Sequence, residues 1–180
     1  MGKLWLHNEL VDRLAMLQQT EATHPGINQV AIEKDWWVTV TLKALFQTDC
    51  RDSLIFKGGT SLSKGFNIIE RFSEDIDLAI SHSFFGIEKT NKSQRDKLKK
   101  LARKYIQETL SAQLDAQLKD MGITGYTIEN VTHLFSALGH PCLSEAIFPN
   151  PARPSCIALT VPRPSQGIPV SFALTLGVCR

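Results

Sequence analysis

Hydrophobic side chains recur at helical spacing in three long stretches of the chain, and each stretch is expected to form a helix. The first covers residues 4–17 and is followed by the turn sequence Thr23-His24-Pro25-Gly26. The second covers residues 29–46. The third is a long amphipathic helix over residues 93–118, with two glycines shortly after its end.

The second helix carries two charged side chains on its hydrophobic side. At 100° per residue, Lys34 and Asp35 fall inside the apolar arc rather than on the solvated face. The arc consists of Val30, Ala31, Val38, Leu42, Leu45 and Phe46. Burying either charge alone is costly, so we expect Lys34 and Asp35 to pair with neighbouring groups or with a functional site.

A short strand, a glycine turn and a helix follow in order. Residues 54–56 are a β-type run, closed by Lys57-Gly58-Gly59. Thr60 or Ser61 is expected to cap the next helix, which runs to about residue 69. The turn therefore presents backbone N–H groups and hydroxyls at the N-terminus of a helix, where anions bind.

The next strand, over residues 75–80, carries two acidic side chains on one face. Strict alternation places Asp75 and Asp77 on one side and three hydrophobic residues on the other. Neighbouring carboxylates repel each other unless a hard cation such as Mg²⁺ lies between their oxygens. The alternative is a solvated edge strand beside an ordinary turn, but the order of strand, turn, helix and acidic strand favours a site for a nucleoside triphosphate with magnesium.

The composition changes from residue 141 onward. Seven of the eight prolines and three of the four cysteines lie in the last 40 residues, which contain no lysine. Residues 126–131, 157–161 and 170–178 are expected to form strands. We therefore separate residues 1–140, the main domain, from residues 141–180, a Pro-rich atypical tail with the composition of a truncated or frame-shifted end.

Length and composition indicate a globular, cytoplasmic protein. The chain has 180 residues, 43% of them hydrophobic and 21% charged, which is typical of one soluble domain and excludes a disordered class. Its apolar runs are too short to span a membrane, and the N-terminus lacks a secretory signal. The four cysteines and five histidines lack metal-ligand spacing, so reduced thiols and structural or solvated histidines are expected.

Positive charge is concentrated in one segment. The net charge is only +2, but residues 89–104 contain eight basic side chains and a single acid, Asp96. Arg95, Lys99 and Arg103 recur at a spacing of four and form one ridge on the predicted helix. Such a ridge is either a solvated helix face or a contact for an RNA backbone.

Three literal stretches resemble the AbiEii/AbiGii toxin family of nucleotidyltransferase-like proteins. They are residues 32–37 (IEKDWW), 56–64 (FKGGTSLSK) and 70–78 (ERFSEDIDL), so the resemblance covers about residues 29–80. It implies an α/β (α+β) fold, namely a minimal nucleotidyltransferase core of the polymerase-beta type with a short mixed sheet and flanking helices. It also implies an NTP substrate, Mg²⁺, RNA or tRNA as acceptor, and a cognate antitoxin. A Walker loop is rejected, because Ser63 and Gly65 stand at its glycine and Ser/Thr positions.

The resemblance assigns roles to individual residues. It makes Asp75 and Asp77 the catalytic metal ligands and Lys64 a phosphate neighbour, with Lys34 and Asp35 as possible support. The triphosphate cradle comprises Gly58, Gly59, Thr60 and Ser61.

Such sites use a third carboxylate on a later strand to complete a two-metal geometry. Beyond Asp120 the only acids are Glu129 and Glu145. Two readings follow: a toxin that transfers a nucleoside monophosphate to an acceptor such as RNA in a toxin–antitoxin or abortive-infection system, or a catalytically incomplete nucleotide-binding module.

Overall fold

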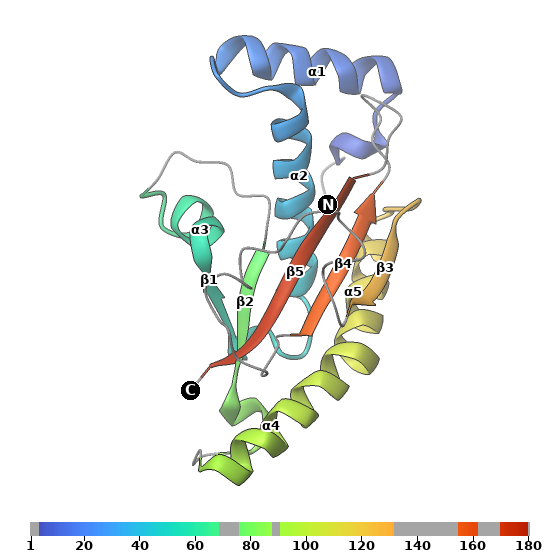
Figure 1. Cartoon of the computed structure of the whole chain (residues 1–180). Coiled ribbons are helices and arrows are strands. Elements are labelled where there is room, and N and C mark those ends of the chain that lie inside the picture. Colours follow the sequence, from blue (N-terminus) through green and yellow to red (C-terminus); the bar gives the residue numbers. More distant parts are fainter. Residues whose placement is uncertain (1–3, 69–75, 88–90, 132–154, 162–169, 180) are drawn as a thin grey trace.

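A mixed five-stranded sheet with flanking helices forms the described part of the chain (Figure 1). The computed structural model describes residues 4–68, 76–87, 91–131, 155–161 and 170–179. The strands are β1 (Leu54–Lys57), β2 (Ile76–Ser81), β3 (Thr127–Val131), β4 (Ser155–Val161) and β5 (Val170–Cys179). They lie in the order β1-β2-β5-β4-β3, and only β2 and β5 run parallel. This confirms the expected α+β class and the mixed sheet.

The helical segments differ from the predicted ones mainly at their ends. Those before β2 are η1 (Trp5–His7), α1 (Leu10–Thr23), α2 (Gln29–Leu45), η2 (Arg51–Ser53), α3 (Gly58–Thr60) and η3 (Ser61–Gly65). Those after it are η4 (His82–Phe85), α4 (Lys92–Tyr105), η5 (Ile106–Leu110) and α5 (Ser111–Asp120). The first helix begins later than predicted because Asn8 and Glu9 are extended and separate it from η1. The second matches the prediction, with the Asn28 side chain capping its first turn.

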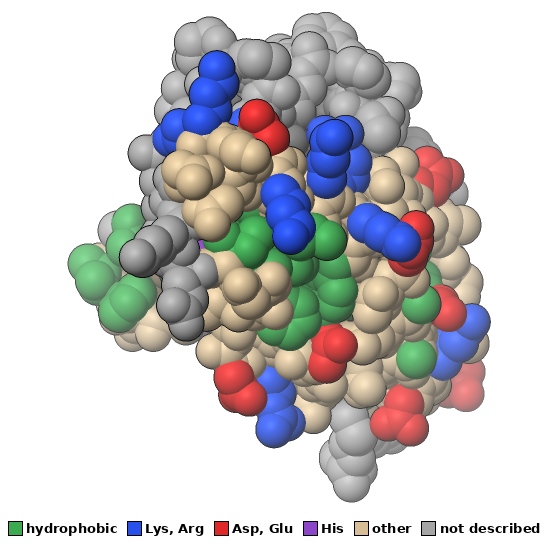
Figure 2. All heavy atoms as spheres, turned by 90° about the horizontal axis from the view of Figure 1, so that it is seen from below, with side chains coloured by type: hydrophobic (Ala, Val, Ile, Leu, Met, Phe, Trp, Pro, Cys, Tyr) green, Lys and Arg blue, Asp and Glu red, His purple; other side chains and the backbone are tan. Residues whose placement is uncertain are grey.

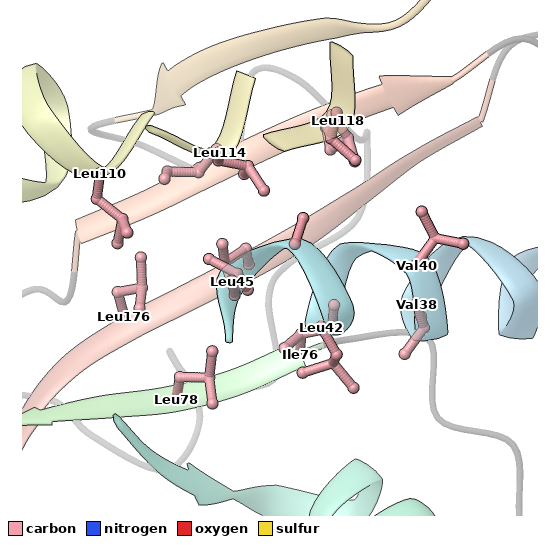
Figure 3. Packing of buried hydrophobic residues seen from close by; sticks show 14 of the residues in the cluster. Val38, Val40, Leu42, Leu45, Ile76, Leu78, Leu110, Leu114, Leu118 and Leu176 are labelled. Atoms are coloured by element: carbon pink, nitrogen blue, oxygen red, sulfur yellow. The ribbon is translucent and has the colours of Figure 1, made fainter. Parts of the chain in front are cut away.

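The hydrophobic core joins α2 and α5 to the sheet (Figure 3). Leu45 of α2, Leu114 of α5 and Ile76 of β2 are all fully buried in it. Leu78 and Leu176, from the neighbouring strands β2 and β5, belong to the same cluster. The inner side of β2 is therefore fixed by helices packed against it, which leaves Asp77 on its other side.

The long helix of residues 92–120 is continuous through a wider turn in its middle. Its buried residues recur every four positions, at Leu98, Ala102, Ile106, Leu110, Leu114 and Leu118. In a regular α-helix each four-residue step rotates the buried face by about 40°. The π-type turn η5 reduces this rotation, so both halves of the helix stay on the sheet. Leu101 follows Leu98 by three positions, a spacing that favours the same helix face, but it lies outside this row and is 37% exposed.

The segment after residue 141 contributes two strands to the same sheet. β5 lies between β2 and β4, and β4 joins β3 to the rest. Ile157, Leu159 and Leu174 of these strands are fully buried in the common core. Among the described residues, none of the helices has the length and hydrophobicity needed to cross a membrane.

The core packing predicts a clear difference between two leucines of the long helix. Leu114→Ala should lower the free energy of unfolding by about 2–5 kcal/mol, because it removes a fully buried side chain and leaves a cavity. Leu101→Ala is the control and should cost less than about 1 kcal/mol, since that side chain is partly exposed. Urea unfolding measures both values, and equal losses would contradict the packing.

Candidate functional site

Asp77 is the second residue of β2 and faces away from the hydrophobic core. Ile76 and Leu78, its neighbours in the strand, are buried in that core, whereas Asp77 is half-buried. The predicted alternation holds for residues 76–78, whereas Ala79, predicted to share the face of Asp77, is 1% exposed, so both faces of the strand are covered there. Asp75, the other predicted metal ligand, lies outside the described residues.

The glycine turn lies directly against the Asp77 carboxylate. Gly58 adopts φ +72°, and a Cβ built on it would stand 2.5 Å from Asp77 Oδ2. Any other residue at position 58 would be strained and would also collide with that oxygen. The pairing of Lys57 with Asp77 across β1 and β2 explains the contact, because the turn begins at the next residue.

The surroundings of Asp77 make its charge costly. Desolvation by burial raises the pKa of the Asp77 carboxyl above its ordinary value. Lys57 is its cross-strand neighbour but is exposed, and no ion pair joins Asp77 to any residue that the structure describes. A partly desolvated carboxylate without a cationic partner suits a bound metal ion.

The described residues alone do not complete a metal site. They contain no group of three or more His, Cys, Asp or Glu side chains placed to hold an ion. The predicted partner ligand of Asp77 is Asp75, which falls in the undescribed segment 69–75. Asp77 thus fits a metal, and the predicted Asp75–Asp77 pair remains a prediction.

The helix after β1 begins three or four residues earlier than predicted. Its first residue is Gly58, and Lys57 occupies the N-cap position. The prediction that Thr60 or Ser61 caps this helix was wrong, because both lie within it and are buried. The left-handed conformation of Gly58 lets the helix start at the glycine itself. Of the predicted cradle, Gly58 and Gly59 are therefore the residues at the first turn, where helical N–H groups lack internal partners.

Lys64 connects this helix to α2. Its Nζ lies 2.8 Å from Asp35 Oδ2 and 2.8 Å from Thr39 Oγ1. The expectation that Asp35 pairs with a neighbouring or functional group is confirmed in this ion pair. Asp35 is not deeply buried, since its side chain is 35% exposed, and Lys34 is likewise half-buried.

No acidic residue lies in the strand beside Asp77. In the parallel pairing of β2 and β5, the register position next to Asp77 is Thr175, and the sequence of β5 contains no acid. Glu129 belongs to β3, three strands away from β2 in the sheet. At about 4.8 Å per strand that is about 14 Å, too far to share an ion with Asp77.

The predicted basic ridge lies at the other end of β2. Asp77 is near the start of this strand, whereas α4 follows the strand's far end through η4 (Figure 1). Arg95 is half-buried, Lys99 lies 3.7 Å from Asp96, and Arg103 is exposed. Figure 2, which views that end of the molecule, shows Lys and Arg side chains around a hydrophobic patch.

Three residues of this region were missed by sequence reasoning. Thr39 binds Lys64, and its position one turn after Asp35 is the signal that could have found it. Lys57 is next to Asp77 only through strand pairing, which the sequence pattern does not specify. Glu33 is 1% exposed, although it immediately precedes the two charged residues that were singled out.

The contact between turn and carboxylate predicts an unusually harmful glycine substitution. Gly58→Ala should cost more stability than Gly86→Ala, which has a similar φ of +67° but open space around the added Cβ. Gly86→Ala is the control: it measures the loss of stability from backbone strain alone, which is about 1–2 kcal/mol. Thermal unfolding gives both values, and Asp77→Ala should relieve part of the excess in a double mutant. Equal losses for the two glycines would show that the contact is absent.

Comparison with known proteins identifies the family. The model described as "Nucleotidyl transferase AbiEii toxin, Type IV TA system" matches residues 41–136, just over half of the chain. This region contains the glycine turn, β2 and α4, but begins after Lys34 and Asp35. Neither a search of curated proteins nor a search of solved structures gave a match. The chain therefore belongs to the AbiEii nucleotidyl transferase toxin family of type IV toxin–antitoxin systems.

Proposed function

We propose that this chain binds a nucleoside triphosphate with Mg²⁺ at the Gly58–Asp77 site and transfers the nucleoside monophosphate to an acceptor, with RNA as the acceptor class. The observation that carries the proposal is the approach of the glycine turn to the Asp77 carboxylate. It puts an anion-binding backbone and a cation-binding side chain in contact, and a metal-bound triphosphate needs both. A polymerase-beta type core accounts for this arrangement and is part of the proposal.

The phosphates would lie along the first turn of α3. The first N–H groups of this turn have no partner within the helix and are the donors that a phosphate oxygen would use, while the Asp77 carboxylate fills the space where a side chain at residue 58 would lie. Lys64 supports this placement because two of its three N–H donors bind Asp35 and Thr39, which leaves one for a ligand oxygen. Lys57, exposed beside Asp77, adds a second positive charge.

Asp77, with Asp75 from the undescribed segment, would hold the magnesium ion. When bound, the ion neutralises charge on the transferring phosphoryl group and orients it for in-line attack. The protein's own contribution is to hold the Asp77 carboxylate rigidly against the turn, where its desolvation strengthens electrostatic attraction.

The acceptor would be guided by basic side chains of α4. Besides the ridge of Arg95, Lys99 and Arg103, the outer side of this helix borders an open hollow of about 640 Å³. Its lining residues are Lys92, Ser93, Asp96, Lys97 and Lys100. From Asp77 to the end of β2 the strand rises about 13 Å, so an acceptor bound here must extend along the sheet to reach the site.

A nucleotide-binding module that transfers nothing is the second candidate. It is favoured by one observation, the absence of any acid in β5 beside Asp77 together with the distant position of Glu129. The two candidates differ in a single result. Incubation with total RNA, Mg²⁺ and each labelled nucleotide should give labelled RNA with the parental chain and none with Asp77→Asn. Binding of nucleotide without incorporation would replace the transferase by the module.

The raised pKa of Asp77 predicts a stability change that reverses with the ligand. Without metal, the folded protein must keep a desolvated carboxylate ionised at pH 7, so Asp77→Asn should raise the melting temperature in EDTA. Because the folded pKa is raised, this penalty is present above the folded pKa. It vanishes as the pH falls below the unfolded value, so the two proteins should converge near pH 3–4.

The same variant is then measured with Mg²⁺ and nucleoside triphosphate. The parental chain should gain more stability from the ligand than Asp77→Asn does, because only the carboxylate binds the metal strongly. Thermal unfolding over pH with and without ligand provides all four values. An equal ligand-induced shift in both proteins would remove Asp77 from the metal site.

The ridge on α4 predicts a salt-dependent contribution to RNA binding. Three phosphate contacts with a single strand give a slope of about −2 in log affinity against log salt. Replacing Arg95, Lys99 and Arg103 by Gln should flatten this slope and leave triphosphate binding unchanged. Replacing Lys43, Arg51 and Lys119 by Gln is the matched control, because it removes the same charge from residues outside α4. Equal effects of both triple variants would mean that charge alone, and not the ridge, attracts RNA.

A further inference from the structure

A small cleft lies beside the first turns of α2, and Asp35, the partner of Lys64, is one of its lining residues. It has a volume of about 160 Å³ and is lined by Thr20, His24, Ile27, Ile32 and Asp35. These residues come from the end of α1, the connection to α2 and the first turns of α2. None of them is assigned a function by the family match, which begins at residue 41.

The size of this cleft selects the kind of ligand. A water molecule occupies about 30 Å³, so the cleft has room for about five waters, or for one planar ring system. Sites that enclose a whole drug-sized molecule measure about 300–1,000 Å³. The cleft is thus a subsite for one part of a larger ligand.

The lining offers apolar surface and hydrogen-bond acceptors together. Ile27 and Ile32 supply the apolar surface, and both are half-buried. His24 is held in place because its Nδ1 lies 3.1 Å from the Thr20 carbonyl oxygen. Asp35 uses Oδ2 to bind Lys64, and within the described part of the chain its Oδ1 accepts no hydrogen bond. A flat ring with an exocyclic amino group matches these surfaces.

Asp35 connects the cleft to the proposed phosphate site. It lines the cleft and binds Lys64, which follows Gly58 by six residues in the same helical segment. At 1.5 Å per residue the segment would rise about 9 Å between them, and its wider π-type part makes the rise smaller. A ligand in the cleft would therefore continue past Lys64 toward the glycine turn and Asp77.

We infer that the cleft is the base subsite of the nucleotide, and that Asp35 accepts a hydrogen bond from an amino group of the base. This inference rests on the proposed function, because the phosphates are placed at the Gly58–Asp77 site. It adds a specificity-determining role for residues of α1 and α2. Bases with an amino group at the edge facing Asp35 are preferred over bases with a carbonyl oxygen there, which the carboxylate repels.

Blocking the cleft tests its occupation. The probes are each nucleoside triphosphate and inorganic tripolyphosphate, titrated calorimetrically with Mg²⁺. Ile27→Trp should weaken binding of the preferred nucleotide at least tenfold and leave tripolyphosphate binding unchanged. The control is Val11→Trp, which adds the same bulk at a side chain that is 76% exposed on α1. Melting temperatures verify that both variants fold. If Ile27→Trp does not fold, Ile27→Ala replaces it, and a smaller loss of nucleotide affinity is expected.

A comparison of CTP with UTP tests the role of Asp35, because cytosine carries an amino group where uracil carries a carbonyl oxygen. The parental chain should bind CTP at least about fivefold more tightly than UTP, and Asp35→Asn should remove this preference. The ratio is unaffected by any general weakening through Lys64, since both nucleotides share their phosphates.

The outcomes separate the two proposals. Unchanged nucleotide affinity in Ile27→Trp, or equal affinity of the parental chain for nucleotide and tripolyphosphate, overturns the base subsite and leaves the phosphate site standing. An unchanged CTP/UTP ratio in Asp35→Asn overturns the role of Asp35. If the parental chain binds neither nucleotide nor tripolyphosphate, the proposed function fails and the base subsite fails with it.

Discussion

The close approach of Gly58 to Asp77 is the constraint on which the site depends. Residue 58 adopts a positive φ, which favours glycine. Its Cβ position must also stay empty, because an added Cβ would stand 2.5 Å from Asp77 Oδ2. The sheet enforces the approach, since Lys57 at the end of β1 is paired with Asp77 in β2. Turn and carboxylate are therefore held together by the backbone, and the proposed ligand would meet a preorganised pair of groups rather than two that it must assemble.

The packing of the sheet explains why this pair can be held rigidly. Ile76 and Leu78, on either side of Asp77, are buried against the helices, so the carboxylate cannot turn inward without displacing core side chains. β2 is also an inner strand, flanked by β1 and β5. An inner strand has hydrogen bonds on both sides, and its side chains are accordingly well fixed. The same arrangement keeps Asp77 partly desolvated, which is why its ionised form is costly without a cation.

The parts of the fold set by local pattern could be predicted from the sequence, and those set by distant contacts could not. The bounds of α2, the alternation at residues 76–78 of β2 and the glycine turn follow from spacing within a few residues. The buried residues of the long helix keep a spacing of four through the wider turn η5, which helical periodicity does not reveal, and Leu101 lies outside that row. The parallel pairing of β5 with β2 joins residues about 100 positions apart and has no local signature. For the same reason the charge on Asp35 indicated a partner, but the pattern could not name Lys64.

The ion pair of Lys64 with Asp35 determines how charge is distributed around the turn. A lysine without partners could adopt many conformations. The Nζ of Lys64 is instead fixed at 2.8 Å from both Asp35 Oδ2 and Thr39 Oγ1 of α2. Its charge is largely balanced by Asp35, so Asp77 is left without compensation among the described residues. In the proposed site this distribution suits a divalent cation at Asp77 and an anion at the remaining donor of Lys64. Because Asp35 fixes the lysine and also lines the cleft, a change at Asp35 would alter both the proposed phosphate end and the cleft, and the two parts of the proposed ligand site would be coupled through one side chain.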